Sequence, residues 1–145
     1  MKRSILAVAA LLVATGAVIA QSDPIAARKE LMKGNGKATG GAVKMLKGEA
    51  PFDLAVAQAA LKVYADTAAK APALFPDTSK TGGETEALPA VWTAKADFEA
   101  KFAKLGKDAE AAMAAIKDEA SFKAAFPGVL KNCGDCHETY RAKKS

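Results

Sequence analysis

Both cysteines and the only histidine of this 145-residue chain lie close together, in the stretch Cys133-Gly134-Asp135-Cys136-His137. Residues three and four positions apart share one face of a helix. A helix over this stretch therefore presents two thiols and one imidazole on the same side. Whatever fold the chain adopts must leave room beside this face for the group that these side chains hold.

The CxxCH spacing is the attachment signal for c-type haem. In this interpretation, Cys133 and Cys136 form thioethers with the vinyl groups of one covalently attached haem c. His137 then binds the haem iron from one side. The predicted cofactor is one haem c with its iron.

Three other interpretations of the motif were compared with haem attachment. A redox-active CxxC normally follows a strand in a βαβ unit, and the sequence has no strand pattern. A structural zinc site needs four ligands, and the chain has no further Cys or His. A disulfide between Cys133 and Cys136 gives no reason for His137 to follow directly. The sequence favours haem.

The N-terminal segment has the pattern of a secretory signal peptide. Lys2 and Arg3 precede an apolar run over residues 5–19, and small residues lead up to Gln21. We predict cleavage after Ala20 and export to an oxidising compartment. The alternative is an uncleaved anchor, but the run is shorter than the roughly 20 apolar residues that span a membrane. We therefore expect no stable membrane insertion after cleavage.

The remaining chain, residues 21–145, is long enough for one domain with one core. Its basic and acidic side chains are scattered, with a small excess of basic ones after Lys2 and Arg3 are removed. No basic stripe with interleaved aromatics and no zinc-finger spacing occurs, so we expect no nucleic-acid partner.

Helix spacing and helix punctuation predict an all-α fold. Asp23-Pro24, Asp53 and Asp118 are typical helix starts. The predicted helices cover residues 24–47, 53–71, 89–116 and 119 onward into the cysteine motif, with a kink expected at Pro127. An irregular link over residues 74–89 is too long for a tight turn. We expect an antiparallel up-down-up-down four-helix bundle with haem near the C-terminal helix.

The second side of the iron needs a different ligand, because no second histidine exists. A methionine thioether is the candidate, and Met32, Met45 and Met113 remain after signal cleavage. Met32 and Met45 lie roughly 20 Å apart along one helix, so both cannot reach the iron. Met32 has the better setting, beside a glycine cluster. The alternative is that Met32 simply fills the core.

The chain resembles the class II cytochromes c, which comprise the cytochromes c′ and their low-spin relatives. The resemblance rests on ARKELMKGNG (27–36), KGEAPFD (47–53), LFPDTSKTGGETEALPAVW (74–92) and CGDCHETYRAKK (133–144). It implies a periplasmic four-helix bundle that is commonly a homodimer through its first two helices. It also implies that Arg28 lies near a haem propionate and Arg141 near the proximal imidazole.

Position 32 divides that family. The low-spin members use a methionine there as sixth ligand and carry electrons, and LMKGNG resembles them. We therefore predict a periplasmic one-electron carrier with His137 and Met32 as iron ligands and periplasmic redox partners. The alternative is a five-coordinate protein that binds NO or CO. Enzymatic activity is not expected, because peroxidase chemistry needs a distal acid or base and the only histidine is proximal.

Overall fold

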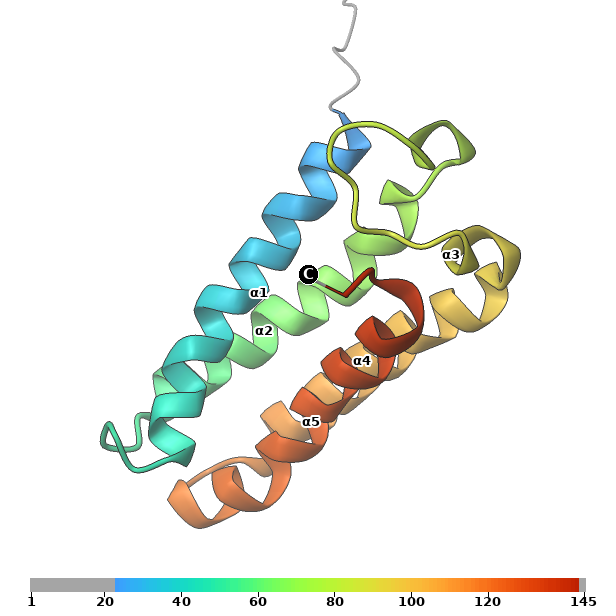
Figure 1. The fold of residues 1–145 in the computed structure, drawn as a ribbon. Helices are drawn as coiled ribbons and strands as arrows, with labels where there is room; N and C mark the ends of the chain where they lie inside the picture. The colour runs from blue at the N-terminus through green and yellow to red at the C-terminus, as the bar shows by residue number, and fades with distance from the viewer. Residues whose placement is uncertain (1–22, 144–145) are drawn as a thin grey trace, which may run out of the picture.

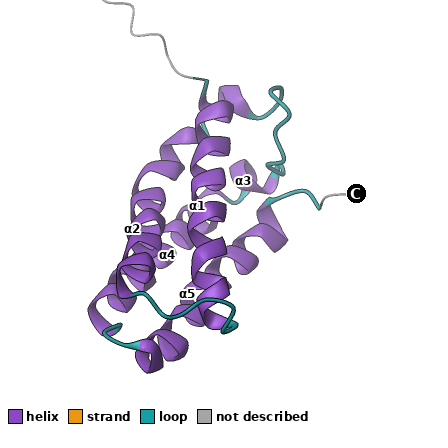
Figure 2. Cartoon of the chain, turned by 90° about the vertical axis from the view of Figure 1, so that its left-hand side faces the viewer, coloured by secondary structure: helices purple, strands orange, loops and turns teal. Residues whose placement is uncertain are grey.

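The computed structural model describes residues 23–143, so the predicted signal peptide (1–20) lies outside the described residues. Four long helices alternate in direction (Figure 1): α1 (Pro24–Leu46), α2 (Leu54–Lys70), α4 (Lys95–Ala115) and α5 (Glu119–Tyr140). Loops are confined to the two ends of the bundle (Figure 2). The predicted antiparallel four-helix bundle is confirmed. Within the described range, no helix has the length and apolarity needed to cross a membrane.

The predicted helix starts are confirmed, and each rests on an aspartate. The Asp23 carboxylate accepts a hydrogen bond from the Ile25 amide, 2.9 Å away. Asp53 accepts from the second and third amides of α2. Asp118 and Ser121 bond each other's backbone amides in a capping box. These side chains satisfy amides that have no partner inside their own helix.

The third predicted helix is wrong in one respect, because the structure divides it in two. The short helix α3 (Ala90–Thr93) ends at Ala94, whose φ of −120° and ψ of 43° are not helical, and α4 begins after it. The break lets the Trp92 indole donate to the Phe75 carbonyl at 3.0 Å. It also lets Phe98 pack edge-on against Phe75 with ring centroids 4.7 Å apart. Contacts with the link thus override local helix propensity.

The link between α2 and α3 is also partly helical. Two 3-10 turns, η1 (Ala71–Leu74) and η2 (Asp77–Ser79), follow α2. The rest of the link crosses this end of the bundle and meets the end of α5. There the Leu88 amide donates to the Tyr140 carbonyl at 3.0 Å, and the Ala142 amide donates to the Glu86 carbonyl at 2.8 Å. The link is therefore fastened to the helix that carries the cysteine motif.

The buried side chains form two clusters. The larger cluster lies among α1, α2, α4 and α5, and its largest fully buried members are Leu61, Tyr64, Ile116, Phe122 and Phe126. The second cluster lies where the link crosses and includes Phe75, Val91, Phe98, Phe102 and Tyr140.

The helices do not pack evenly around the bundle. The closest pairs are α2 with α4, α1 with α2, and α4 with α5, whereas α1 and α5 are not among the closely packed pairs. Gly106 of α4 is so near α2 that a Cβ there would lie 3.1 Å from the Cβ of Ala68. The bundle is tight on the side of α2 and α4, and open between α1 and α5.

Phe122→Ala should lower the free energy of unfolding by about 3–5 kcal/mol, because Phe122 is fully buried and its removal leaves a cavity. Leu54→Ala is the control, since Leu54 is 37% exposed and should cost far less. Urea unfolding followed by circular dichroism measures both. Equal losses in the two variants would contradict this description of the core.

Candidate functional site

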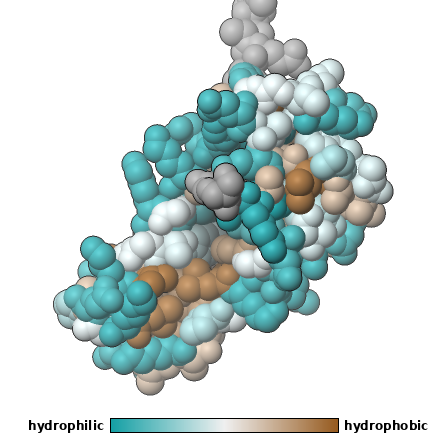
Figure 3. All heavy atoms as spheres, in the orientation of Figure 1, coloured by the Kyte–Doolittle hydropathy of each residue, from teal (hydrophilic) through white to brown (hydrophobic). Residues whose placement is uncertain are grey.

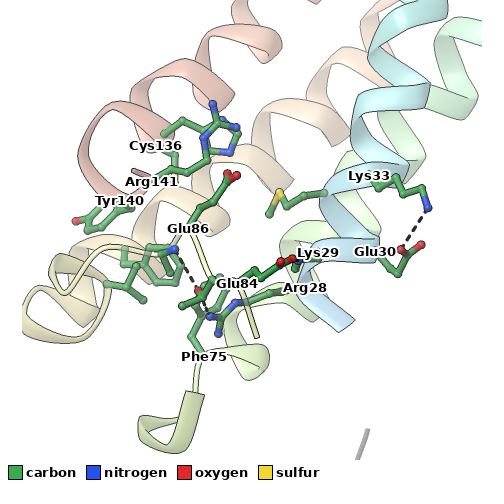
Figure 4. Close-up of a pocket in the computed structure, with 16 residues that line it drawn as sticks. Arg28, Lys29, Glu30, Lys33, Phe75, Glu84, Glu86, Cys136, Tyr140 and Arg141 are labelled. Atoms are coloured by element: carbon green, nitrogen blue, oxygen red, sulfur yellow. Dashed lines mark hydrogen bonds and ion pairs between the residues drawn. The ribbon is translucent and has the colours of Figure 1, made fainter. Parts of the chain in front are cut away.

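A cavity of about 500 Å³ lies on the open side of the bundle (Figure 4). Its walls are α1, the link over residues 84–87, the start of α4 and the last turn of α5. Figure 3 views this open face, where apolar atoms lie between hydrophilic rims. The volume is within the usual range of small-molecule and cofactor sites.

The α5 wall carries Cys136, His137, Tyr140 and Arg141. Burial lowers the pKa of the half-buried His137 imidazole, and the nearby Arg141 charge lowers this pKa further, whereas Glu86 opposes the shift. The ring is therefore held neutral at pH 7, which is the form that binds a metal. The role of Arg141 beside a haem-bound imidazole stays a prediction.

The two thiols are half-buried and are not joined in a disulfide. Burial raises the pKa of both Cys133 and Cys136, so both remain thiols at neutral pH. Cys136 lines the cavity, but Cys133 is not among the lining residues. Cys133 lies one helical turn earlier on α5.

The α1 wall carries Met32, which lines the same cavity as His137. The Met32 sulfur accepts a hydrogen bond from the side-chain amide of Asn35, with 3.8 Å between nitrogen and sulfur. The amide oxygen of Asn35 accepts from the Thr67 hydroxyl of α2 at 2.9 Å. The sulfur is thus connected to α2 through one intervening side chain.

Arg28 is only 4% exposed, and its partners are not those that the resemblance implies. Its two terminal nitrogens donate to the carbonyls of Leu74 and Ser79 and to the hydroxyls of Ser79 and Thr85. These four bonds use all four hydrogens on the terminal nitrogens. Contact with a propionate stays a prediction, and in this structure Arg28 fastens the link to α1.

The Arg28 guanidinium lies over two aromatic rings. Its central carbon lies 4.6 Å from the centroid of the Phe75 ring and 5.9 Å from that of Trp92. Such contacts favour a cation over a ring face. Burial lowers the pKa of Arg28, partly offset by the Asp23 charge. The arginine stays charged, because its ordinary pKa is far above neutrality.

The apolar floor of the cavity is formed by Phe75, Val91, Phe98 and Tyr140. The Tyr140 ring packs edge-on against Phe98 with centroids 5.1 Å apart. Its hydroxyl donates to Asp97 at 2.5 Å, and this bond, with burial, raises the pKa of Tyr140 to about 12. The ring is therefore fixed with its hydroxyl turned to α4, and an apolar face remains for a bound group.

The cavity fits the predicted haem. A flat apolar macrocycle needs aromatic and aliphatic walls, a neutral imidazole on one side and thiols at its edge. The lining provides the walls, and α5 provides His137 and Cys136. Of the predicted site residues, the structure brings Arg28, Met32, Cys136, His137 and Arg141 to one cavity.

Sequence reasoning missed several residues of the site. Asn35 and Thr67 had no signal, because their pairing depends on how α1 and α2 meet. Ser79 and Thr85 looked like ordinary loop residues, yet they bind the buried Arg28. For Tyr140, position was a usable signal, since it lies one turn after His137 on the same helix.

The chain is similar to known proteins over its whole length. The family model described as "Cytochrome C'" matches residues 23–141. Cytochrome c′ of Rhodopseudomonas palustris is 53% identical over an alignment of 146 residues that covers 100% of both chains. Cytochrome c-556 of the same organism is 36% identical over 148 residues, 99% of each chain. The similarity therefore includes every wall of the cavity.

The fold was compared with solved structures in the same way. A structure of cytochrome c′ from Rhodopseudomonas palustris has a TM-score of 0.84 and 56% sequence identity. The match covers 86% of this chain and 100% of that one. The helices that surround the cavity therefore have counterparts in a solved structure.

Arg28→Met should lower the free energy of unfolding by about 2–4 kcal/mol, because it removes the buried guanidinium and the four hydrogen bonds that it donates. Amide hydrogen exchange should also become faster over residues 79–87. Lys29→Met is the control, since Lys29 makes only an exposed ion pair with Glu84 and should change stability by less than about 0.5 kcal/mol. Unchanged exchange in Arg28→Met would show that the arginine does not fasten the link.

Proposed function

The chain belongs to the cytochrome c′ family and carries covalent haem c, and from this we propose that it is a periplasmic protein that binds small gases such as NO or CO. In this proposal Cys133 and Cys136 attach the haem, and His137 is its single protein ligand. The haem supplies a one-electron couple and an iron position that can accept a diatomic gas.

The chain's own residues would prepare the site for this cofactor. The neutral His137 ring offers a nitrogen to the iron without first losing a proton. Phe75, Phe98 and Tyr140 exclude water from the apolar face of the cavity. Arg28 keeps the link closed over one end of the cavity. Together they support a buried haem whose distal side faces Met32.

The observation that carries this proposal is the full-length identity of 53% to a protein named cytochrome c′. It favours the second of the two functions expected from the sequence over Met32 ligation. The contact from Asn35 to the Met32 sulfur supports the same choice, because it gives this sulfur a partner within α1. Met32 would then restrict access to the iron without binding it.

A second candidate is the electron carrier with His137 and Met32 as axial ligands. It is favoured by relatives named cytochrome c-556, one of them 36% identical over nearly the whole chain. Met32 also lines the same cavity as His137. Electron transport through a periplasmic redox partner fits either candidate. A homodimer through α1 and α2 and cleavage after Ala20 both stay predictions.

The absorption spectrum of the purified ferric protein should lack the near-red band of methionine bound to iron. The ferrous protein should take up CO, because its iron has an open position. Met32→Leu should leave the ferric spectrum unchanged, since Leu has a similar volume and no sulfur. Met32→Ala should bind CO several-fold faster, because it removes most of the side chain that restricts access.

The second candidate predicts the opposite set of results. The wild-type ferric protein would then show the methionine band, Met32→Leu would lose it, and CO would bind the wild type slowly. Either result assigns the function of the distal side.

A further inference from the structure

Met32, Asn35 and Thr67 form a short chain of hydrogen bonds from the cavity into the bundle. The Asn35 amide nitrogen donates to the Met32 sulfur at 3.8 Å, and the Thr67 hydroxyl donates to the Asn35 amide oxygen at 2.9 Å. Thr67 belongs to α2 and is 1% exposed. The chain of bonds therefore has a fixed, buried end on a neighbouring helix.

The two partners of Asn35 together decide which way its amide faces. A side-chain amide carries an accepting oxygen and a donating nitrogen on the same carbon, and the two point in different directions within one plane. The Met32 sulfur can only accept, so the nitrogen is turned toward it, and the oxygen then accepts from the Thr67 hydroxyl. Asn35 is thus a donor held in place beside a thioether.

The Met32 side chain needs a partner to hold its sulfur in one position. A methionine side chain has three rotatable bonds and adapts readily to the space around it. Met32 lines the same cavity as His137, so its sulfur has access to the space that a bound haem fills. One hydrogen bond of ordinary net strength changes the ratio of two side-chain positions by a few-fold to about tenfold.

We infer that Asn35, anchored by Thr67, is a positioning residue that holds the Met32 sulfur on α1 and so keeps the distal side of the haem iron open. The inference rests on the proposed gas-binding function. It means that Asn35 and Thr67, which are not ligands themselves, determine whether Met32 binds the iron. Without the donor, the Met32 sulfur would be free to turn toward a bound haem and offer a lone pair to its iron.

Asn35→Leu in the haem-containing protein tests this role, because Leu keeps the approximate volume and removes the donor. The ferric spectrum should gain the near-red methionine band, with the six-coordinate fraction raised by a few-fold to about tenfold. CO binding to the ferrous protein should slow by a similar factor. Thr67→Val should change both in the same direction, but less, because Asn35 remains and only loses its anchor.

Tyr64→Phe is the matched control. The Tyr64 hydroxyl of α2 shares a 2.7 Å hydrogen bond with Thr39 of α1, so this variant also removes one bond between the same two helices. That bond does not involve Met32, so the spectrum and the CO rate should equal those of the wild type. If the effect came from a general loosening of α1 against α2, the spectrum and the CO rate of Tyr64→Phe would change as well.

The double variant Asn35→Leu/Met32→Leu identifies the sulfur as the group that moves. It should recover the wild-type spectrum, because no thioether remains to bind the iron. A methionine-like band that persists in the double variant overturns the inference.

Two outcomes separate this inference from the proposed function. A wild-type spectrum that already carries the methionine band contradicts the proposed function. The positioning role alone is overturned by a different set of results. In that set, the wild type lacks the band, and the Asn35→Leu and Thr67→Val proteins melt as folded holoproteins but have the wild-type spectrum.

Discussion

Helices α1 and α5 share a cavity where neighbouring helices of a bundle usually share an interface. On the opposite side, α2 and α4 approach so closely that a Cβ at Gly106 would lie 3.1 Å from the Cβ of Ala68, which is a tight contact. The tight side fixes the four helix axes and leaves α1 and α5 apart. The cavity between them has an apolar floor, and a flat macrocycle has the shape to cover it. Of the predicted site residues, Arg28, Met32, Cys136, His137 and Arg141 line this opening.

The two walls of the cavity are held by different interactions. The α5 wall is part of a continuous helix that packs on α4, and the backbone of the link is fastened to its last turn. The α1 wall packs on α2 and has polar contacts in addition, namely the buried Arg28 with the link and the Asn35–Thr67 pair with α2. Polar contacts are directional and must be fully satisfied when buried. This makes the distal wall the place where a single substitution can change coordination without unfolding the bundle.

The sequence predicted those features that depend on neighbours in the chain. Asp23, Asp53 and Asp118 mark helix starts because a cap needs only its own first turn. The CxxCH motif predicted the α5 wall for the same reason. The break at Ala94 was missed, since it depends on Trp92 meeting the distant Phe75 carbonyl. The partners of Arg28 were missed as well, because they are contributed by a link that folds back across the bundle. Met45 proved to be core, 4% exposed, with its sulfur accepting from the Asp53 amide.

The placement of the two thiols on α5 affects the order in which the holoprotein can be made. All other walls of the cavity, from α1 through the link to the start of α4, precede the cysteines in the chain. During synthesis from the N-terminus, the tightly packed pair α2 and α4 is complete before the attachment site emerges. The last segment to be synthesised is therefore the one that carries the haem attachment site, and it completes the cavity that the preceding elements form.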